Sequence, residues 1–174
     1  GVYMEIKIKE WNVNFGSDKD AEICKFAKEY INDTDIIVFT EVIDNDSIKD
    51  LLDKLDSEYI KYASKIREVK QYNQIVIAVK TELISCSKIR QVDIDEKKWD
   101  INSLPDICHL EIITSEGKLK NVIGTRVRID GGSNADYKDR RVQFENLVRY
   151  IEELENVIVL GDFNNGMLKA DSDK

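Results

Sequence analysis

Three segments of this chain end in side chains that carry oxygen ligands. The apolar run at 157–160 is followed by Gly-Asp-Phe-Asn-Asn at 161–165. The apolar stretch 35–41 ends in a glutamate, and the stretch 6–14 ends in Trp-Asn-Val-Asn. Ligands of open α/β structures bind beyond the carboxyl ends of the strands, so we expect three strands to bring these side chains to one edge. The candidates are Asn12, Glu41, Asp162 and Asn164.

Carboxylate and amide oxygens are hard ligands, which suit Mg²⁺ or Mn²⁺. The three cysteines and the single histidine are scattered, so no Cys/His cluster competes for a softer metal. Each motif alone also has an ordinary explanation: Glu41 as a solvated carboxylate, Asn12 as a turn residue, and 161–165 as a turn-forming loop. Because the three occur together, we predict a Mg²⁺ or Mn²⁺ site of modest affinity.

The ordered motifs W-N-V-N, D-I-I-V-F-T-E and G-D-F-N resemble those of the endonuclease/exonuclease/phosphatase superfamily, the DNase I-like phosphodiesterases. The resemblance runs over residues 6–165. It implies an α/β sandwich of two packed sheets flanked by helices, and a Mg²⁺-dependent phosphodiesterase that cleaves DNA or RNA. It also implies that Asn12 and Glu41 lie at the metal, and that Asp162 and Asn164 position the attacking water and the scissile phosphate.

Two positions depart from the family pattern. The family usually carries Thr-His where this chain has Thr125-Arg126. Arginine grips a phosphate bidentately but does not give up its proton, so we expect Arg126 to bind and stabilise the phosphate without acting as a general acid. Thr40 stands where the family usually has glutamine, which is expected to change a contact around Glu41 and to leave the metal ligand in place. Arg140 and Arg141 are expected to be surface charges.

The family continues with further strands and a distal Ser-Asp-His motif, for which residues 170–174 offer no counterpart. We therefore expect a single domain, residues 1–174, that represents the N-terminal and central part of the family fold and has little hydrolytic activity as it stands. Two other functions stay open. One is hydrolysis of a small phosphoester or a lipid headgroup, and the other is a catalytically incomplete domain that binds nucleic acid or protein.

Composition limits the remaining choices. The 174 residues, 42% of them apolar, are enough for one substantial core. A net charge of −8 argues against a general nucleic-acid coat but not against a nuclease, because a divalent ion can supply positive charge locally. The odd, scattered cysteines favour a reduced, cytoplasmic protein. No apolar stretch approaches the ~20 residues that span a bilayer, so no stable membrane association is expected, and the oligomeric state stays open.

The periodicity of apolar residues predicts how these motifs are positioned. The only histidine, His109, alternates with core residues and is expected to be half-exposed, without a catalytic role. A hairpin turn is expected at Glu116-Gly117. Strands are expected at about 4–12, 35–41, 58–63, 73–79, 84–92, 107–114, 119–129 and 157–160. Helices are expected at about 17–31, from 46 or 47 to 55, and around Phe144, Leu147, Val148 and Ile151.

Overall fold

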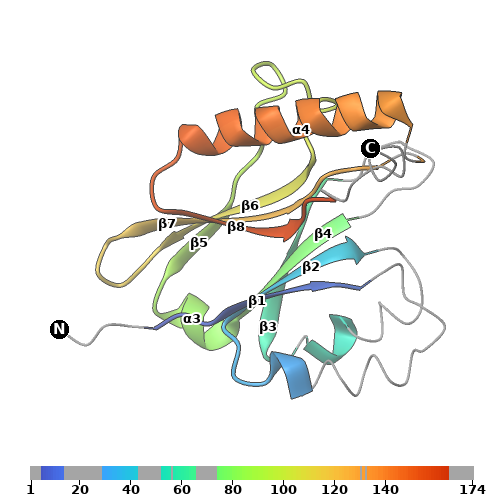
Figure 1. The fold of residues 1–174 in the computed structure, drawn as a ribbon. Coiled ribbons are helices and arrows are strands. Elements are labelled where there is room, and N and C mark those ends of the chain that lie inside the picture. The colour runs from blue at the N-terminus through green and yellow to red at the C-terminus, as the bar shows by residue number, and fades with distance from the viewer. Residues whose placement is uncertain are drawn as a thin grey trace.

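Two four-stranded sheets pack face to face, and helical segments cover their outer faces (Figure 1). The computed structural model describes residues 5–13, 29–42, 52–55, 57–65, 74–129, 131 and 133–164. The predicted fold class, two packed sheets flanked by helices, is confirmed. Within the described ranges, no helix is both long enough and apolar enough to cross a membrane.

The first sheet has the strand order β1-β2-β4-β3. Strand β1 (Ile8–Asn12) runs parallel to β2 (Ile36–Val42), with Asn12 opposite Thr40. Strand β4 (Gln74–Lys80) is antiparallel to both β2 and β3 (Tyr59–Ala63). The carboxyl ends of β1 and β2, where two of the motifs lie, therefore meet at one edge.

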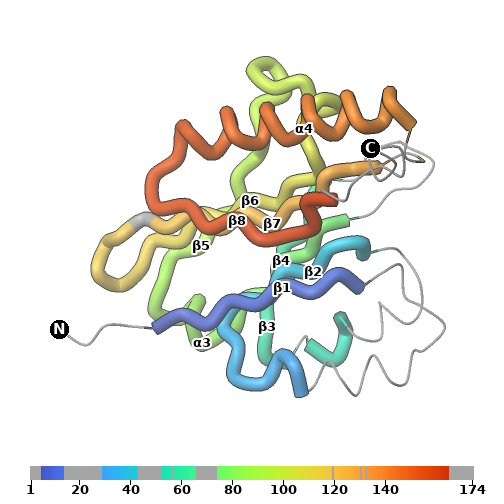
Figure 2. Tube along the Cα trace, viewed as in Figure 1, coloured from blue at the N-terminus to red at the C-terminus, as the bar shows by residue number. Residues whose placement is uncertain are grey.

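The second sheet has the order β5-β6-β7-β8. Strands β5 (Lys88–Gln91), β6 (Asp106–Ile113) and β7 (Leu119–Arg126) are antiparallel neighbours, and β8 (Val157–Asp162) runs parallel to β7. Strand β8 also lies next to β1 and β2 of the first sheet (Figure 2). The third motif thus reaches the same edge from the other sheet.

Apolar side chains form a core between the two sheets and a further cluster on the outer face of each sheet. Several strands are therefore apolar on both sides. The core between the sheets contains Ile36, Val38, Ile75, Ile77, Val79, Cys108, Leu110, Ile112 and Val122. On the outer face of the first sheet, Ile37 and Phe39 pack with Ile31 and Leu55, which belong to helical turns. On the outer face of the second sheet, Ile107, Ile123, Leu147 and Tyr150 form a third cluster.

Helix α4 (Asn134–Glu152) covers the second sheet (Figure 1). It begins at Ser133, whose hydroxyl accepts a hydrogen bond of 3.2 Å from the backbone N–H of Asp136. The buried residues of the helix are Asp136, Gln143, Leu147 and Tyr150. Phe144, one of the apolar residues that predict this helix, is 48% exposed instead.

Most of the predicted elements match within a few residues, and the exceptions have local causes. The predicted strand at 84–92 is wrong at its start: residues 81–85 form a short helix, α3 (Thr81–Ser85), which buries Leu83 where the chain passes between the sheets. The strand predicted at 119–129 ends at Arg126. The turn before it is confirmed, since Gly117 N donates to Thr114 O at 2.8 Å. Of the first two predicted helices, residues 29–31 and 52–55 are helical, and most of the remainder lies outside the described residues.

His109 corrects one prediction. It is 2% exposed, because both faces of β6 are covered: one by the first sheet and the other by α4. Its ring nitrogens lie 2.7 Å from Tyr150 Oη and 2.8 Å from Asn121 Oδ1. His109 is therefore a fully buried histidine with two hydrogen-bond partners in the core.

Candidate functional site at the shared strand edge

The three motifs come together where β1, β2, β7 and β8 end. Asn12 Nδ2 donates to Asp162 Oδ2 at 3.2 Å, which joins the ends of β1 and β8. Arg126 Nε donates to Glu41 Oε1 at 3.2 Å, which joins the ends of β7 and β2. Both contacts cross between the sheets. The structure therefore brings all five predicted site residues to one edge, although their catalytic roles stay predictions.

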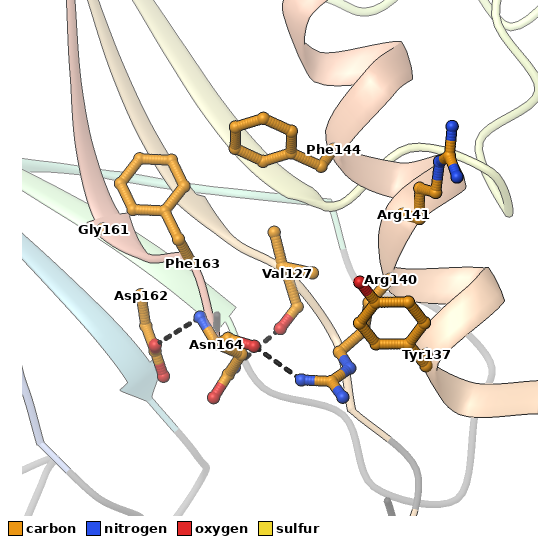
Figure 3. Close-up of a pocket in the computed structure, with 9 residues that line it drawn as sticks. All are labelled: Val127, Tyr137, Arg140, Arg141, Phe144, Gly161, Asp162, Phe163 and Asn164. Atoms are coloured by element: carbon orange, nitrogen blue, oxygen red, sulfur yellow. Dashed lines mark hydrogen bonds between the residues drawn. The ribbon is translucent and has the colours of Figure 1, made fainter. Parts of the chain in front are cut away.

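The loop after β8 is held by hydrogen bonds on both sides of Asn164 (Figure 3). Asp162 Oδ1 accepts from Asn164 N at 3.0 Å, and Asn164 Nδ2 donates to Val127 O at 2.7 Å. Arg140 Nη1 donates to Asn164 O at 2.7 Å. The amide of Asn164 is thus used to hold the loop against the end of β7. Its backbone has φ 45°, in the left-handed region that asparagine tolerates better than most residues.

Arg140 corrects the expectation of a surface charge. Its side chain is 12% exposed, with Nε 3.3 Å from Asp136 Oδ2. Through Asn164 it fixes the motif loop to helix α4. Arg141 does match the expectation, because its side chain is 73% exposed.

Glu41 is 8% exposed and has φ 57°, also in the left-handed region. The pairing of β2 with β4 shifts register between Phe39 and Val42, which accommodates this turn of the backbone. A non-glycine residue held in this region costs about 1 to 3 kcal/mol, and such strain gathers at functional sites. The strained conformation aims the Glu41 carboxylate at Arg126, and it supports the hypothesis that the carboxylate has a function.

Arg126 lies in a buried network of charges. It is 7% exposed, and its Nη1 lies 3.9 Å from Asp106 Oδ2. Arg128 Nη1 lies 3.3 Å from Asp106 Oδ1 and 2.6 Å from Leu104 O. Both arginines therefore face the same side of the chain, where they share Asp106. None of the sequence motifs includes Asp106. The antiparallel register set by the hairpin turn between β6 and β7 does place Asp106 opposite Arg126.

Gln143 ties the segment after β7 to helix α4. It is fully buried, and its Oε1 accepts from Arg128 N at 2.9 Å while Nε2 donates to Arg128 O at 3.3 Å. Because the amide satisfies both backbone groups of Arg128, this segment keeps a fixed path after the strand ends. No sequence motif points to this role.

Glu10 adds a carboxylate that the motifs do not include. It precedes Asn12 by two residues on β1 and so shares its face of the strand. Thr40 Oγ1 donates to Glu10 Oε1 at 3.0 Å. Thr40, which stands where the family usually has glutamine, therefore has Glu10 as its hydrogen-bond partner. Burial raises the pKa of Glu10 above its usual value, the Thr40 hydrogen bond lowers it, and the charge of Asp162 raises it.

The oxygen atoms at this edge are of the kind that bind a hard divalent cation. The described residues contain no group of three or more His, Cys, Asp or Glu side chains arranged to hold a metal. Glu41 and Asp162 nevertheless supply carboxylate oxygens, and Asn12 supplies an amide beside Asp162. An all-oxygen set of this kind fits Mg²⁺ or Mn²⁺, and these three residues would hold it.

Solved structures share this fold. The chain aligns with TDP2 of D. rerio complexed with a single-strand DNA product at a TM-score of 0.67 and 16% identity, over 96% of this chain and 64% of that chain. It aligns with the human Nocturnin catalytic domain with bound sulfate at 0.59 and 15%, over 91% and 64%. For ANGEL2, a 2′,3′-cyclic phosphatase, the values are 0.56 and 19%, over 83% and 43%. The chain thus spans less than two thirds of each.

Sequence comparison extends the likeness from fold to family. A stretch of 120 residues, 67% of this chain, is 26% identical to Reticulocyte-binding protein homolog 1 of Plasmodium falciparum (isolate 3D7), but it covers only 4% of that protein and carries no functional argument. The model of the Endonuclease/Exonuclease/phosphatase family, in contrast, matches residues 10–173, and so includes all three motifs. The chain belongs to the endonuclease/exonuclease/phosphatase family of nucleases and phosphoesterases.

Proposed function

We propose that this protein is a Mg²⁺-dependent phosphodiesterase that hydrolyses DNA or RNA. The observation that carries the proposal is the meeting of Asn12, Glu41 and Asp162, from both sheets, beside the buried cation Arg126. Family membership supports phosphoester chemistry. The likeness in fold to TDP2, whose solved complex contains a single-strand DNA product, supports nucleic acid as the substrate class.

Asp162 is suited to orient the attacking water. Asn12 and Asn164 each donate to a different oxygen of its carboxylate, which fixes the carboxylate plane. Each carboxylate oxygen can accept more than one hydrogen bond, so Asp162 can also accept one from water. A water held there would attack phosphorus in line, and the bond from phosphorus to the leaving oxygen would break.

Arg126 is suited to stabilise the charge that develops on the phosphate. Its Nε is engaged by Glu41, which orients the fork of the guanidinium. Because arginine stays protonated, it contributes charge and hydrogen bonds and does not protonate the leaving group. When bound at Glu41, Asn12 and Asp162, a divalent ion would add Lewis-acid stabilisation of the same charge.

Hydrolysis of plasmid DNA, RNA and a generic phosphodiester, measured with Mg²⁺ and with a chelator at protein concentrations high enough to quantify the low turnover expected of this chain, tests the proposal. We expect Asp162→Asn to slow turnover by roughly 10² to 10³, the usual effect of removing one preorganised polar group. Glu152→Gln removes an exposed carboxylate at the other end of α4 from Arg140, and it should act like the parent. Metal-independent turnover, or equal rates for Asp162→Asn and the parent, would contradict the proposal.

Two alternatives retain specific support. The arginine at position 126, where the family usually has histidine, favours a domain that binds nucleic acid without cleaving it, and binding without metal-dependent turnover would identify that case. Hydrolysis of a small phosphoester is supported by the fold shared with ANGEL2, a 2′,3′-cyclic phosphatase. Turnover of small phosphoesters with no detectable nucleic-acid binding at low salt would identify it.

A further inference from the structure

A cavity of about 960 Å³ opens beside the Asp162 loop, between that loop and helix α4 (Figure 3). Its walls combine aromatic rings, two arginines and the proposed catalytic loop. The lining includes Tyr137, Arg140, Arg141, Phe144, Asp162 and Phe163. A ligand in this cavity would therefore contact the loop whose Asp162 is proposed to orient the attacking water.

Two rings on α4 face this cavity without being buried. Tyr137 is 51% exposed and Phe144 is 48% exposed. Phe144 is supported by Phe163 in an edge-to-face contact, with centroids 6.3 Å apart and planes at 74°. The Arg140 guanidinium carbon lies 5.7 Å from the centroid of the Tyr137 ring. Each ring thus has one aromatic or guanidinium neighbour that also lines the cavity, while about half of each side chain stays exposed and open to a flat partner.

Two arginines, Arg140 and Arg141, line the cavity together with the Asp162 carboxylate, on a chain whose net charge is −8. Arg141 has a highly exposed side chain, and its Nε donates to Glu145 one helical turn away at 2.8 Å. Exposed pairs of this kind are weak, so the guanidinium can exchange this partner for a phosphate. Exposed rings beside arginines are the combination that binds single-stranded nucleic acid, because bases stack on rings while arginines bind the backbone.

We propose that this cavity is a nucleobase subsite, in which an unpaired base next to the scissile phosphate stacks on Tyr137 or Phe144 and Arg141 contacts an adjacent phosphate. The inference rests on the proposed function and adds a preference for single strands. A base in a duplex has both faces covered by its stacked neighbours, so it can reach these rings only when it is unstacked. The subsite tolerates any base, since every base has a flat face.

Fluorescence anisotropy with a short labelled oligo-dT and a matched abasic oligonucleotide separates base stacking from phosphate contact. The parent should bind oligo-dT more tightly than the abasic strand. Tyr137→Ala should weaken binding of oligo-dT by about fivefold or more and leave the abasic strand unaffected, whereas Tyr137→Phe keeps the ring and should keep the affinity. Arg141→Gln should weaken both strands and lower the salt slope by about one.

Val142→Ala is the matched control, because Val142 is 42% exposed on the same helix and does not line the cavity. Equal affinity of the parent for the two strands, or unchanged oligo-dT binding by Tyr137→Ala, would overturn the subsite. So would a clear loss of thermal stability in Tyr137→Ala relative to Val142→Ala, since the ring would then pack against protein. Mg²⁺-dependent hydrolysis of a generic phosphodiester by the parent would show that the proposed function stands even if the subsite does not.

Discussion

Two carboxylates from different sheets approach Arg126. Glu41 belongs to β2 of the first sheet, and Asp106 belongs to β6 of the second. The Arg126 and Glu41 side chains are 9% and 10% exposed, so solvent screens their interaction poorly. Removing either partner would leave an uncompensated buried charge, which makes alanine a poor test of function at this position. A substitution that keeps the charge is more informative.

Arg126→Lys keeps the positive charge but loses the planar fork. A lysine ammonium is a point charge and cannot reproduce the directed contact of the Arg126 guanidinium with Glu41 while also binding two phosphoryl oxygens. We expect this variant to bind inorganic phosphate roughly tenfold more weakly by titration calorimetry. Arg141→Lys, at an exposed position, should change phosphate binding less. If Arg126→Lys bound phosphate as well as the parent, bidentate recognition would be the wrong account.

His109 allows a prediction about pH at the same scale. Asn121 Oδ1 can only accept a hydrogen bond, so His109 Nε2 carries the proton and Nδ1 accepts from the Tyr150 hydroxyl. Burial lowers the pKa of His109 below its usual 6.5. Folding therefore favours the neutral ring. The resulting stabilisation is fully present above the unfolded-state pKa and is lost as the pH falls below about 6.5 toward the folded value.

Chemical denaturation between about pH 7.5 and pH 5.5 measures this effect, with a slope of at most about 1.4 kcal/mol per pH unit. The chain has one histidine, so His109→Gln should flatten the dependence. Glu10 acts in the opposite direction: burial raises the pKa of its carboxyl, so its contribution to stability rises as the pH falls. Glu10→Gln is therefore the right background for comparison. An unchanged slope in His109→Gln would assign the dependence to other groups.

At the scale of elements, the positions of most strands, and the edge at which three of them end, could be predicted because apolar periodicity and the three motifs mark them. The contacts that hold the site could not. The burial of Arg140 depends on where α4 lies over the loop after β8, and the role of Gln143 depends on the path of the chain after β7. The helix at Thr81–Ser85 could not be predicted either. Leu83 and Ile84 are typical of a strand, and only the position where the chain crosses from the first sheet to the second explains the helix.

Gly161 tests the pairing of β7 with β8. Its φ is 153°, and a Cβ built there would lie 1.8 Å from Thr125 O, a backbone atom that cannot move without disturbing the strand pair. We expect Gly161→Ala to destabilise the protein by more than about 2 kcal/mol in urea denaturation. Gly117→Ala is the control: its φ of 74° is also unfavourable to alanine, but nothing lies within 4 Å of the added Cβ. Equal losses would show that backbone strain alone, rather than the contact with β7, is responsible.

At the scale of the whole molecule, the proposed cation site joins two layers of the fold. Asn12 and Glu41 end strands of the first sheet, and Asp162 ends a strand of the second. A cation held by ligands from both sheets binds only when the sheets are packed together. Its binding energy should therefore stabilise the entire domain rather than one segment, because a ligand that binds only the folded state shifts unfolding by mass action.

We expect Mg²⁺ at about ten times its dissociation constant to raise the unfolding free energy by about 1.4 kcal/mol, or the melting temperature by roughly 3 to 5 °C. Near-ultraviolet and far-ultraviolet circular dichroism should report the same shift, since packing and secondary structure would be lost together. Potassium chloride at matched ionic strength controls for screening. Glu41→Gln should abolish the shift, whatever its own effect on stability. A shift of the same size in Glu41→Gln would show that Glu41 is not a ligand. A shift seen in only one of the near- and far-ultraviolet signals would show that the cation does not join the two sheets.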